Sequence, residues 1–321
     1  MKIKRLLRRL MQQSALACLV LVVLSSAVRA ELGKKLSDFD ASCPSYSPVS
    51  KRIAFFHHAD AGAPPELWLM DSEGNQRERL VETFQAPRDM AWSPDGKALF
   101  FTSPGPTNVR SEQWSLWKLS LQTRLVQEVY TSSAGELVTP RISPDGRKIA
   151  LATEKNVVVV NADGSAPRAI VVNARLPQCQ AWSPDSRTIA YTVSPEWPIN
   201  KAPYSIDGRI GDAHLVDASG EKQRLVARMS PTKFLQWSAS GKYLYYLMNG
   251  EIAPLLTHEK SFVRIATEEG ADPEVLIDFK TWEADVSCFS FGDDAKTIFY
   301  DSKLGGGCDF EEGSRIYKIS F

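Results

Sequence analysis

The stretch WSPDGKALFFT, Trp92–Thr102, is the clearest copy of a unit that recurs along the chain. Its Ser-Pro-Asp-Gly segment is typical of a tight turn, because proline fixes φ, aspartate bonds to the nearby backbone and glycine accepts positive φ. The aromatic and apolar residues that follow favour a strand. The stretch therefore predicts the end of one strand, a tight reversal and a second strand.

The same pattern of strand, turn and strand occurs in five further segments. These are YSPVSKRIAFF from Tyr46, ISPDGRKIALA from Ile142, WSPDSRTIAYT from Trp182, WSASGKYLYYL from Trp237 and FGDDAKTIFYD from Phe291. Neighbouring copies are 40 to 55 residues apart. That period, with signals for four strands in each unit, is typical of a propeller blade. We therefore predict an all-β protein, a six-bladed β-propeller of four-stranded antiparallel blades. Trp92, Trp182 and Trp237 share one repeat position and are expected to pack between blades.

The last unit contains signals for three strands only, the third being Arg315–Ile319. An unpaired outer edge would expose backbone groups and invite aggregation. Gly33–Asp38 resembles the fourth strands of other units, so we expect the N-terminal strand to pair in the last blade and close the ring. The alternative is a frayed N-terminal arm.

The first thirty residues have the composition of a targeting segment. Met1–Arg9 is cationic, Ala15–Ala27 is apolar, and Val28–Ala30 offers small residues at a cleavage site. The apolar run is shorter than the ~20 residues that a membrane-spanning helix needs, which argues against the alternative of a permanent anchor. We predict a signal peptide over residues 1–30, a propeller over residues 31–321, and a periplasmic product, or a secreted one if the cell has a single membrane.

The charge balance argues against nucleic acid as a partner. The chain has 38 basic and 38 acidic residues, but six of the cations lie in the leader, so residues 31–321 have a net charge of −6. Binding to phosphates requires a basic face.

The WSPDG(K/R)xIA(F/Y) units at Trp92, Ile142 and Trp182 resemble the TolB-type, WD40-like propeller repeat, and the resemblance covers nearly all of Asp40–Phe321. TolB proteins carry an α/β domain before the propeller, whereas only a short segment precedes the first repeat here. The resemblance therefore implies a stand-alone propeller, with an envelope protein or peptide, such as a peptidoglycan-linked lipoprotein, as partner.

Long loops join the second and third strands of several units, and they gather with the connections between blades on one face, called here the loop-rich face. Binding usually resides in such loops on a rigid scaffold, and Trp and Arg are favoured interface anchors. In the alternative interpretation Trp114, Trp197 and Tyr204 only hold their own loops in place. The candidates for partner binding are Arg110, Trp114, Trp197, Tyr204, Arg209, His258 and Asp309.

Known catalytic motifs are missing: the sequence has no G-x-S-x-G elbow, H-E-x-x-H helix or Gly-rich phosphate loop. We predict a non-catalytic binding or scaffold protein of the cell envelope, without a cofactor. One alternative is a carbohydrate-active lyase with its site at the channel mouth, where His57 or His58 with His258 would hold a metal. Another is a structural subunit of an envelope assembly.

Four cysteines remain after removal of the leader. Cys43, Cys179 and Cys288 each lie four residues before the second residue of a repeat copy, near the loop-rich end of the channel. Units one and four lie across the ring, too far apart for a Cys43–Cys179 bond. In an oxidising compartment we predict that Cys308 pairs with Cys288, or alternatively with Cys43, and that Cys179 is buried and reduced.

Overall fold

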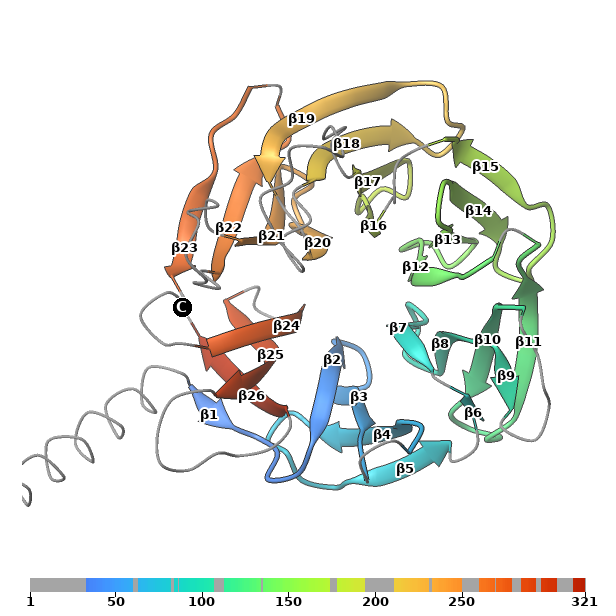
Figure 1. The fold of residues 1–321 in the computed structure, drawn as a ribbon, viewed down its shortest axis with the longest axis vertical. Helices are drawn as coiled ribbons and strands as arrows, with labels where there is room; N and C mark the ends of the chain where they lie inside the picture. The colour runs from blue at the N-terminus through green and yellow to red at the C-terminus, as the bar shows by residue number, and fades with distance from the viewer. Residues whose placement is uncertain are drawn as a thin grey trace, which may run out of the picture.

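The computed structural model shows six four-stranded antiparallel sheets arranged radially around a central channel (Figure 1). This confirms the predicted propeller. The structure describes residues 33–59, 63–81, 84–85, 87–106, 113–133, 135–173, 178–193, 211–230, 233–249, 260–268, 270–278, 284–292, 296–304 and 314–320. Among these residues no helix has the length and apolar character needed to cross a bilayer. The predicted signal peptide lies outside them.

The first strand of each blade lies next to the channel and the last lies at the rim (Figure 1). Blade 1 consists of β2 (Ala41–Ser47), β3 (Arg52–His57), β4 (Glu66–Asp71) and β5 (Glu78–Val81). Blade 2 consists of β7 (Arg88–Trp92), β8 (Ala98–Ser103), β10 (Ser115–Ser120) and β11 (Val126–Thr131). Blade 3 consists of β12 (Val138–Ile142), β13 (Lys148–Ala152), β14 (Val157–Asn161) and β15 (Arg168–Val171). Blade 4 consists of β16 (Gln178–Trp182), β17 (Thr188–Val193), β18 (Gly211–Asp217) and β19 (Gln223–Ser230). Blade 5 consists of β20 (Lys233–Trp237), β21 (Tyr243–Asn249), β22 (Lys260–Ala266) and β23 (Glu274–Asp278). Blade 6 consists of β24 (Ala284–Phe291), β25 (Thr297–Leu304), β26 (Arg315–Ser320) and β1 (Lys34–Lys35).

The repeated turn is held by its own serine and aspartate. Ser93 Oγ accepts a hydrogen bond from the Ala98 amide at 2.9 Å and donates one to Asp95 Oδ1 at 2.6 Å. The Ser93 hydroxyl, together with the Lys97 amide, lowers the pKa of Asp95. Gly96 has a φ of 67°, as the turn requires. The same Ser–Asp bond recurs in blades 3 and 4 at 2.6 Å.

Three tryptophan indoles join neighbouring blades. Trp92 Nε1 donates a hydrogen bond to the Ser45 carbonyl of blade 1 at 2.9 Å. Trp182 and Trp237 do the same to the carbonyls of Arg141 and Ala181, at 2.9 and 3.0 Å. All three rings also pack against buried apolar clusters. The predicted position between blades is confirmed for each.

The N-terminal strand closes the ring. β1 lies next to β26 (Figure 1). The two strands pair antiparallel, with Lys34 opposite Lys318. The strand is shorter than the predicted Gly33–Asp38, but Leu36 continues the contact: its amide donates to the Ile316 carbonyl at 2.8 Å, and its side chain is buried. Ser37 Oγ accepts a hydrogen bond from the Ile316 amide at 2.9 Å. The first residues of the propeller are thus fastened to its last strand.

One element was not expected. The segment between β8 and β10, predicted as a loop, contains β9 (Gly105–Pro106), which pairs with β6 (Phe84–Gln85). Phe84 packs edge-on against Phe101 and Trp117 at 5.0 Å. This small sheet anchors the connection from blade 1 onto blade 2 at the loop-rich face.

Candidate functional site: the channel and its loop-rich mouth

The first strands of the blades enclose a channel cavity of about 620 Å³. A volume of this size is typical of ligand-binding pockets. Its wall is mostly apolar and aromatic, with Tyr46, Trp92, Trp182, Trp237 and Ile142 toward the tight turns. The polar groups among the described lining residues include Asp89, Arg141, Gln236 and Ser290.

Every first strand is irregular near its loop-rich end. Register shifts occur between Ser42 and Ser45, Arg88 and Met90, Val138 and Arg141, Gln178 and Ala181, Lys233 and Gln236, and Val286 and Phe289. A β-bulge bends the strand and re-aims a side chain. In blades 1 to 3 the backbone is left-handed at the bulge: Cys43, Asp89 and Thr139 have φ values of 50°, 38° and 51°. The bulges therefore surround the channel mouth with redirected side chains.

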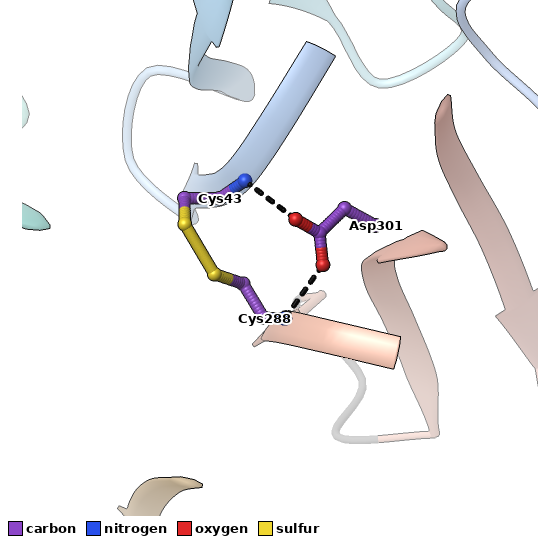
Figure 2. A group of neighbouring side chains, drawn as sticks. All are labelled: Cys43, Cys288 and Asp301. Atoms are coloured by element: carbon purple, nitrogen blue, oxygen red, sulfur yellow. Dashed lines mark hydrogen bonds between the residues drawn. A yellow bond between two sulfur atoms is a disulfide. The ribbon is translucent and has the colours of Figure 1, made fainter. Parts of the chain in front are cut away.

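Carboxylates accept hydrogen bonds from amides at these bulges. The Thr139 amide donates to Asp89 Oδ2 at 3.1 Å, from blade 3 to blade 2. The Cys43 amide donates to Asp301 Oδ2 at 3.0 Å and the Cys288 amide to Asp301 Oδ1 at 2.6 Å (Figure 2). Asp301, on β25, has an exposed fraction of only 1%. A buried carboxylate needs such donors, because an uncompensated charge in the interior is costly.

The sulfurs of Cys43 and Cys288 form a disulfide bond, with their Cα atoms 4.9 Å apart (Figure 2). The bond joins β2 of blade 1 to β24 of blade 6, across the seam that β1 also closes. A disulfide at Cys288 was predicted, but its expected partner was wrong: Cys288 is bonded to Cys43 rather than to Cys308. Adjacent blades place equivalent bulges side by side, and this brings the two sulfurs within bonding distance. Cys308 and the side chain of Cys179 lie outside the described residues.

Trp114 is the predicted partner-binding residue that the structure describes. It is partly buried and packs against the cluster around Leu116 and Leu137. The Arg88 guanidinium lies over its ring at 5.3 Å from the centroid. Arg88 also forms an ion pair with Glu136, and its side chain is 56% exposed. Trp114 is therefore held in place, and it supports an exposed cation near the channel mouth.

The other predicted partner-binding residues lie outside the described residues, so they stay predictions. They are Arg110, Trp197, Tyr204, Arg209, His258 and Asp309.

The two histidines at the end of β3 contact the segment before blade 1 and the start of β2. His57 Nδ1 lies 3.1 Å from the Asp40 carbonyl, and its ring packs against Phe39 with centroids 5.0 Å apart. His58 Nε2 lies 2.9 Å from Ser42 Oγ. These contacts hold the N-terminal segment against blade 1.

Arg88, Asp89 and Asp301 were not among the residues expected at the site, and neither was the pairing of Cys43 with Cys288. A signal existed for the cysteines, because both lie four residues before the second residue of a repeat copy, in blades that ring closure makes neighbours. Asp301 has no comparable signal, because its role depends on a bulge in the adjacent strand.

Comparison with known proteins places the repeat in a family. Residues 17–224 match the model of the TolB beta propeller domain. No curated protein matches the sequence. The structure of TolB from Acinetobacter baumannii is similar over 74% of this chain with 16% identity and a TM-score of 0.56, and the match spans 54% of that protein, about half its length. A TolB candidate from Agrobacterium tumefaciens is 17% identical over 76% of this chain and 80% of its own, with a TM-score of 0.57. A chain of a nidogen/laminin complex is 13% identical over 75% of this chain and 82% of its own, with a TM-score of 0.56. At these identities the structural likenesses show the fold.

Proposed function

Because the chain belongs to the TolB β-propeller domain family, we propose that it is an exported binding or scaffold protein of the cell envelope. In this proposal it is non-catalytic and holds a protein or peptide partner at the loop-rich mouth of the channel. The periplasm is the proposed compartment, with residues 1–30 as the signal peptide. The disulfide supports an oxidising compartment, where such bonds persist.

The described mouth has the features of a docking surface. It surrounds a mostly apolar channel of about 620 Å³ and rests on six sheets. Hydrogen bonds join blade 1 to blade 2, blade 2 to blade 3, blade 3 to blade 4, blade 4 to blade 5 and blade 6 to blade 1. A rigid scaffold reduces the entropy lost on binding. A structurally similar chain comes from a complex of two proteins, nidogen and laminin, so this fold serves as a partner in at least one protein assembly.

The observation that carries the proposal is the pair Arg88 and Trp114. The guanidinium is exposed, stacked on an aromatic ring and oriented by Glu136. Arg and Trp are enriched among the residues that dominate interface energies. Stacking on the indole ring already restricts the Arg88 side chain, so less conformational entropy is lost when a partner binds. Arg110, Trp197, Tyr204, Arg209, His258 and Asp309 remain proposed contributors from the same face.

Site-specific photo-crosslinking tests this proposal. A photoreactive residue is placed at Arg88 in one variant and at Arg124 in another, and the crosslinked envelope proteins are identified by mass spectrometry. Arg124 is the matched control, because it is also a partly exposed arginine in an ion pair, with Glu78, but lies in a turn on the opposite face.

A defined partner captured from position 88 and absent from position 124 is the expected result. Arg88→Ala should weaken binding of that partner by at least about 1 kcal/mol, whereas Arg124→Ala should leave it unchanged. Equal capture at both positions would contradict docking at the loop-rich face.

A further inference from the structure

Three potential metal ligands meet at the seam between blades 1 and 6. The sulfurs of Cys43 and Cys288 and a carboxylate oxygen of Asp301 all lie within 4.8 Å of one another (Figure 2). They come from three different strands: β2, β24 and β25. Cys288 and Asp301 are buried, and Cys43 is partly exposed. Both cysteines line the channel cavity, which gives solutes a route to the sulfurs.

The carboxylate is fixed before any metal arrives. Asp301 accepts a backbone hydrogen bond on each oxygen, from the Cys43 and Cys288 amides. Hydrogen bonds of this kind orient the ligand groups of metal sites. The same two bonds hold the backbones of both cysteines next to the carboxylate.

In the disulfide form the two sulfurs are bonded to each other and provide no thiolate ligand. A dithiol, such as the active site of a thiol–disulfide oxidoreductase, can reduce the bond. Two electrons then pass to the Cys43–Cys288 bond, the dithiol becomes a disulfide, and two free thiols remain. The thiolate of the reducing dithiol should attack the sulfur of Cys43, because Cys43 is partly exposed whereas Cys288 is only 4% exposed.

We propose that the reduced protein binds a thiophilic divalent cation, such as Zn²⁺, through Cys43, Cys288 and Asp301, and that the disulfide excludes it. The cation displaces the two thiol protons, so binding releases two protons. Zn–S distances of about 2.3 Å in a tetrahedral site place the sulfurs about 3.8 Å apart. The sulfurs are bonded to each other in the structure, so they move apart to that distance on reduction, and an Asp301 oxygen lies within 4.8 Å of both. The channel, which both cysteines line, provides access to the fourth position.

The ligand set predicts which cation binds. Two thiolates and one carboxylate select a soft or borderline cation such as Zn²⁺ over Mg²⁺ or Ca²⁺, which prefer oxygen ligands. The two thiolates and the carboxylate carry three negative charges and the cation carries two positive ones, so the occupied site has a net charge of −1. The cation would take over from the disulfide in joining blades 1 and 6.

The test uses the full chain and a variant in which Cys18, Cys179 and Cys308 are replaced by serine. Each protein is prepared with the disulfide intact or reduced with a phosphine that is then removed. Bound zinc is measured by elemental analysis after gel filtration. Thiolate ligation is measured by the sulfur-to-metal charge-transfer absorption of Co²⁺. Circular dichroism checks that the reduced protein stays folded.

About one zinc per chain in the reduced variant, and none in the oxidised one, is the expected result. Asp301→Asn should lower the zinc affinity at least about tenfold and change the Co²⁺ spectrum, and Cys43→Ser should abolish both signals. The proposal is overturned if the folded, reduced protein binds no zinc, or if zinc binding survives Cys43→Ser.

Alkylation of the unsubstituted chain provides a second measurement that needs no variant. In the reduced protein, Zn²⁺ should protect Cys43 and Cys288 from alkylation and leave Cys308 as reactive as before. Equal alkylation rates at Cys43 with and without Zn²⁺ would count against the site.

Discussion

The indole nitrogen of Trp92 donates a hydrogen bond to the backbone carbonyl of Ser45, 2.9 Å away in the neighbouring blade. Equivalent bonds from Trp182 and Trp237 join blade 4 to blade 3 and blade 5 to blade 4. The repeat tryptophan thus has two roles, apolar packing within the seam and a directional bond across it. Ile142 occupies the same repeat position in blade 3 and can provide only the packing.

Trp92→Phe should lower the free energy of unfolding by about 1–2 kcal/mol, because the Ser45 carbonyl loses its donor in a largely buried seam. Urea denaturation measures the loss. Trp117→Phe is the matched control, since the Trp117 indole bonds within its own blade, to the Ser103 carbonyl at 3.1 Å. Only the Trp92 change should accelerate amide hydrogen exchange in β2 of blade 1. Similar exchange in both variants would argue against a role in joining blades.

Gly164→Ala should be strongly destabilising. Gly164 has a φ of 84°, and a Cβ there would overlap the Val129 carbonyl of the neighbouring blade. Gly270→Ala is the control, because Gly270 has a similar φ of 78° but no described atom lies within 4 Å of the position that its Cβ would take. Gly270→Ala should lower the free energy of unfolding by about 1–2 kcal/mol, because alanine is strained in the left-handed backbone conformation. Thermal melting should show a clearly larger loss at Gly164; equal losses would mean that the two blades do not meet closely at this turn.

Acid should weaken the ring closure through Glu73. Hydrogen bonds from Lys318 and then Lys34 lower the pKa of Glu73 from its ordinary value of 4.5 to about 2. Because the folded-state pKa is the lower one, Glu73 stabilises the fold above pH 4.5, and this contribution is lost as the pH falls toward 2. Its side chain is 49% exposed, so solvent limits the effect to no more than about 1 kcal/mol. Glu73→Gln should therefore melt earlier than the unsubstituted protein at pH 7, and the difference should shrink below pH 4.5. A constant difference from pH 7 to pH 2 would contradict this assignment.

Leu36→Ala should destabilise the closure by about 2–4 kcal/mol, because the side chain is 5% exposed and packs among Ala41, Phe55 and Ile316. Lys35→Ala, in the adjacent strand position, should change the free energy of unfolding by less than about 0.5 kcal/mol. Deletion of residues 31–38 should lower the melting temperature further than Leu36→Ala. An unchanged melting temperature after the deletion would show that the N-terminal strand does not close the ring.

Non-reducing peptide mapping should find Cys43 linked to Cys288. The bond spans 245 residues, and closure of so long a loop predicts that Cys43→Ser lowers the stability by about 2–5 kcal/mol. Reduction of the unsubstituted protein should produce a similar loss when no metal is added. A Cys288–Cys308 peptide would refute the pairing seen in the structure and restore the one expected from the sequence.

Local chemistry explains why the blades are predictable from the sequence. The turn of Ser93, Asp95 and Gly96 is stabilised by contacts within five residues, so its residue types alone indicate it. Repetition then indicates the number of blades, and an incomplete sixth unit indicates the N-terminal closing strand.

The chemistry at the channel mouth is harder to predict because it depends on contacts between blades. Asp301 bonds to an amide 258 residues away, and only the bulge in β2 makes that amide available. Arg88, Trp114 and Glu136 are in contact but come from three separate segments of the chain. The sequence places Cys43, Cys288 and Cys308 on one face. Whether Cys288 bonds to Cys43 or to Cys308, however, depends on the direction of the Cys43 and Cys288 side chains at their bulges.

The pairing of β1 with β26 also constrains the order of folding. During synthesis β1 is made before every other described strand of the propeller, whereas its partner β26 is made after them. Blades 1 to 5 contain all their strands in sequence and can form as the chain grows, whereas the sixth must wait for both ends of the propeller. Until then, the Leu36 side chain and the edge of β2 lack the neighbours that they have in the finished ring, and both must be kept from associating with other proteins.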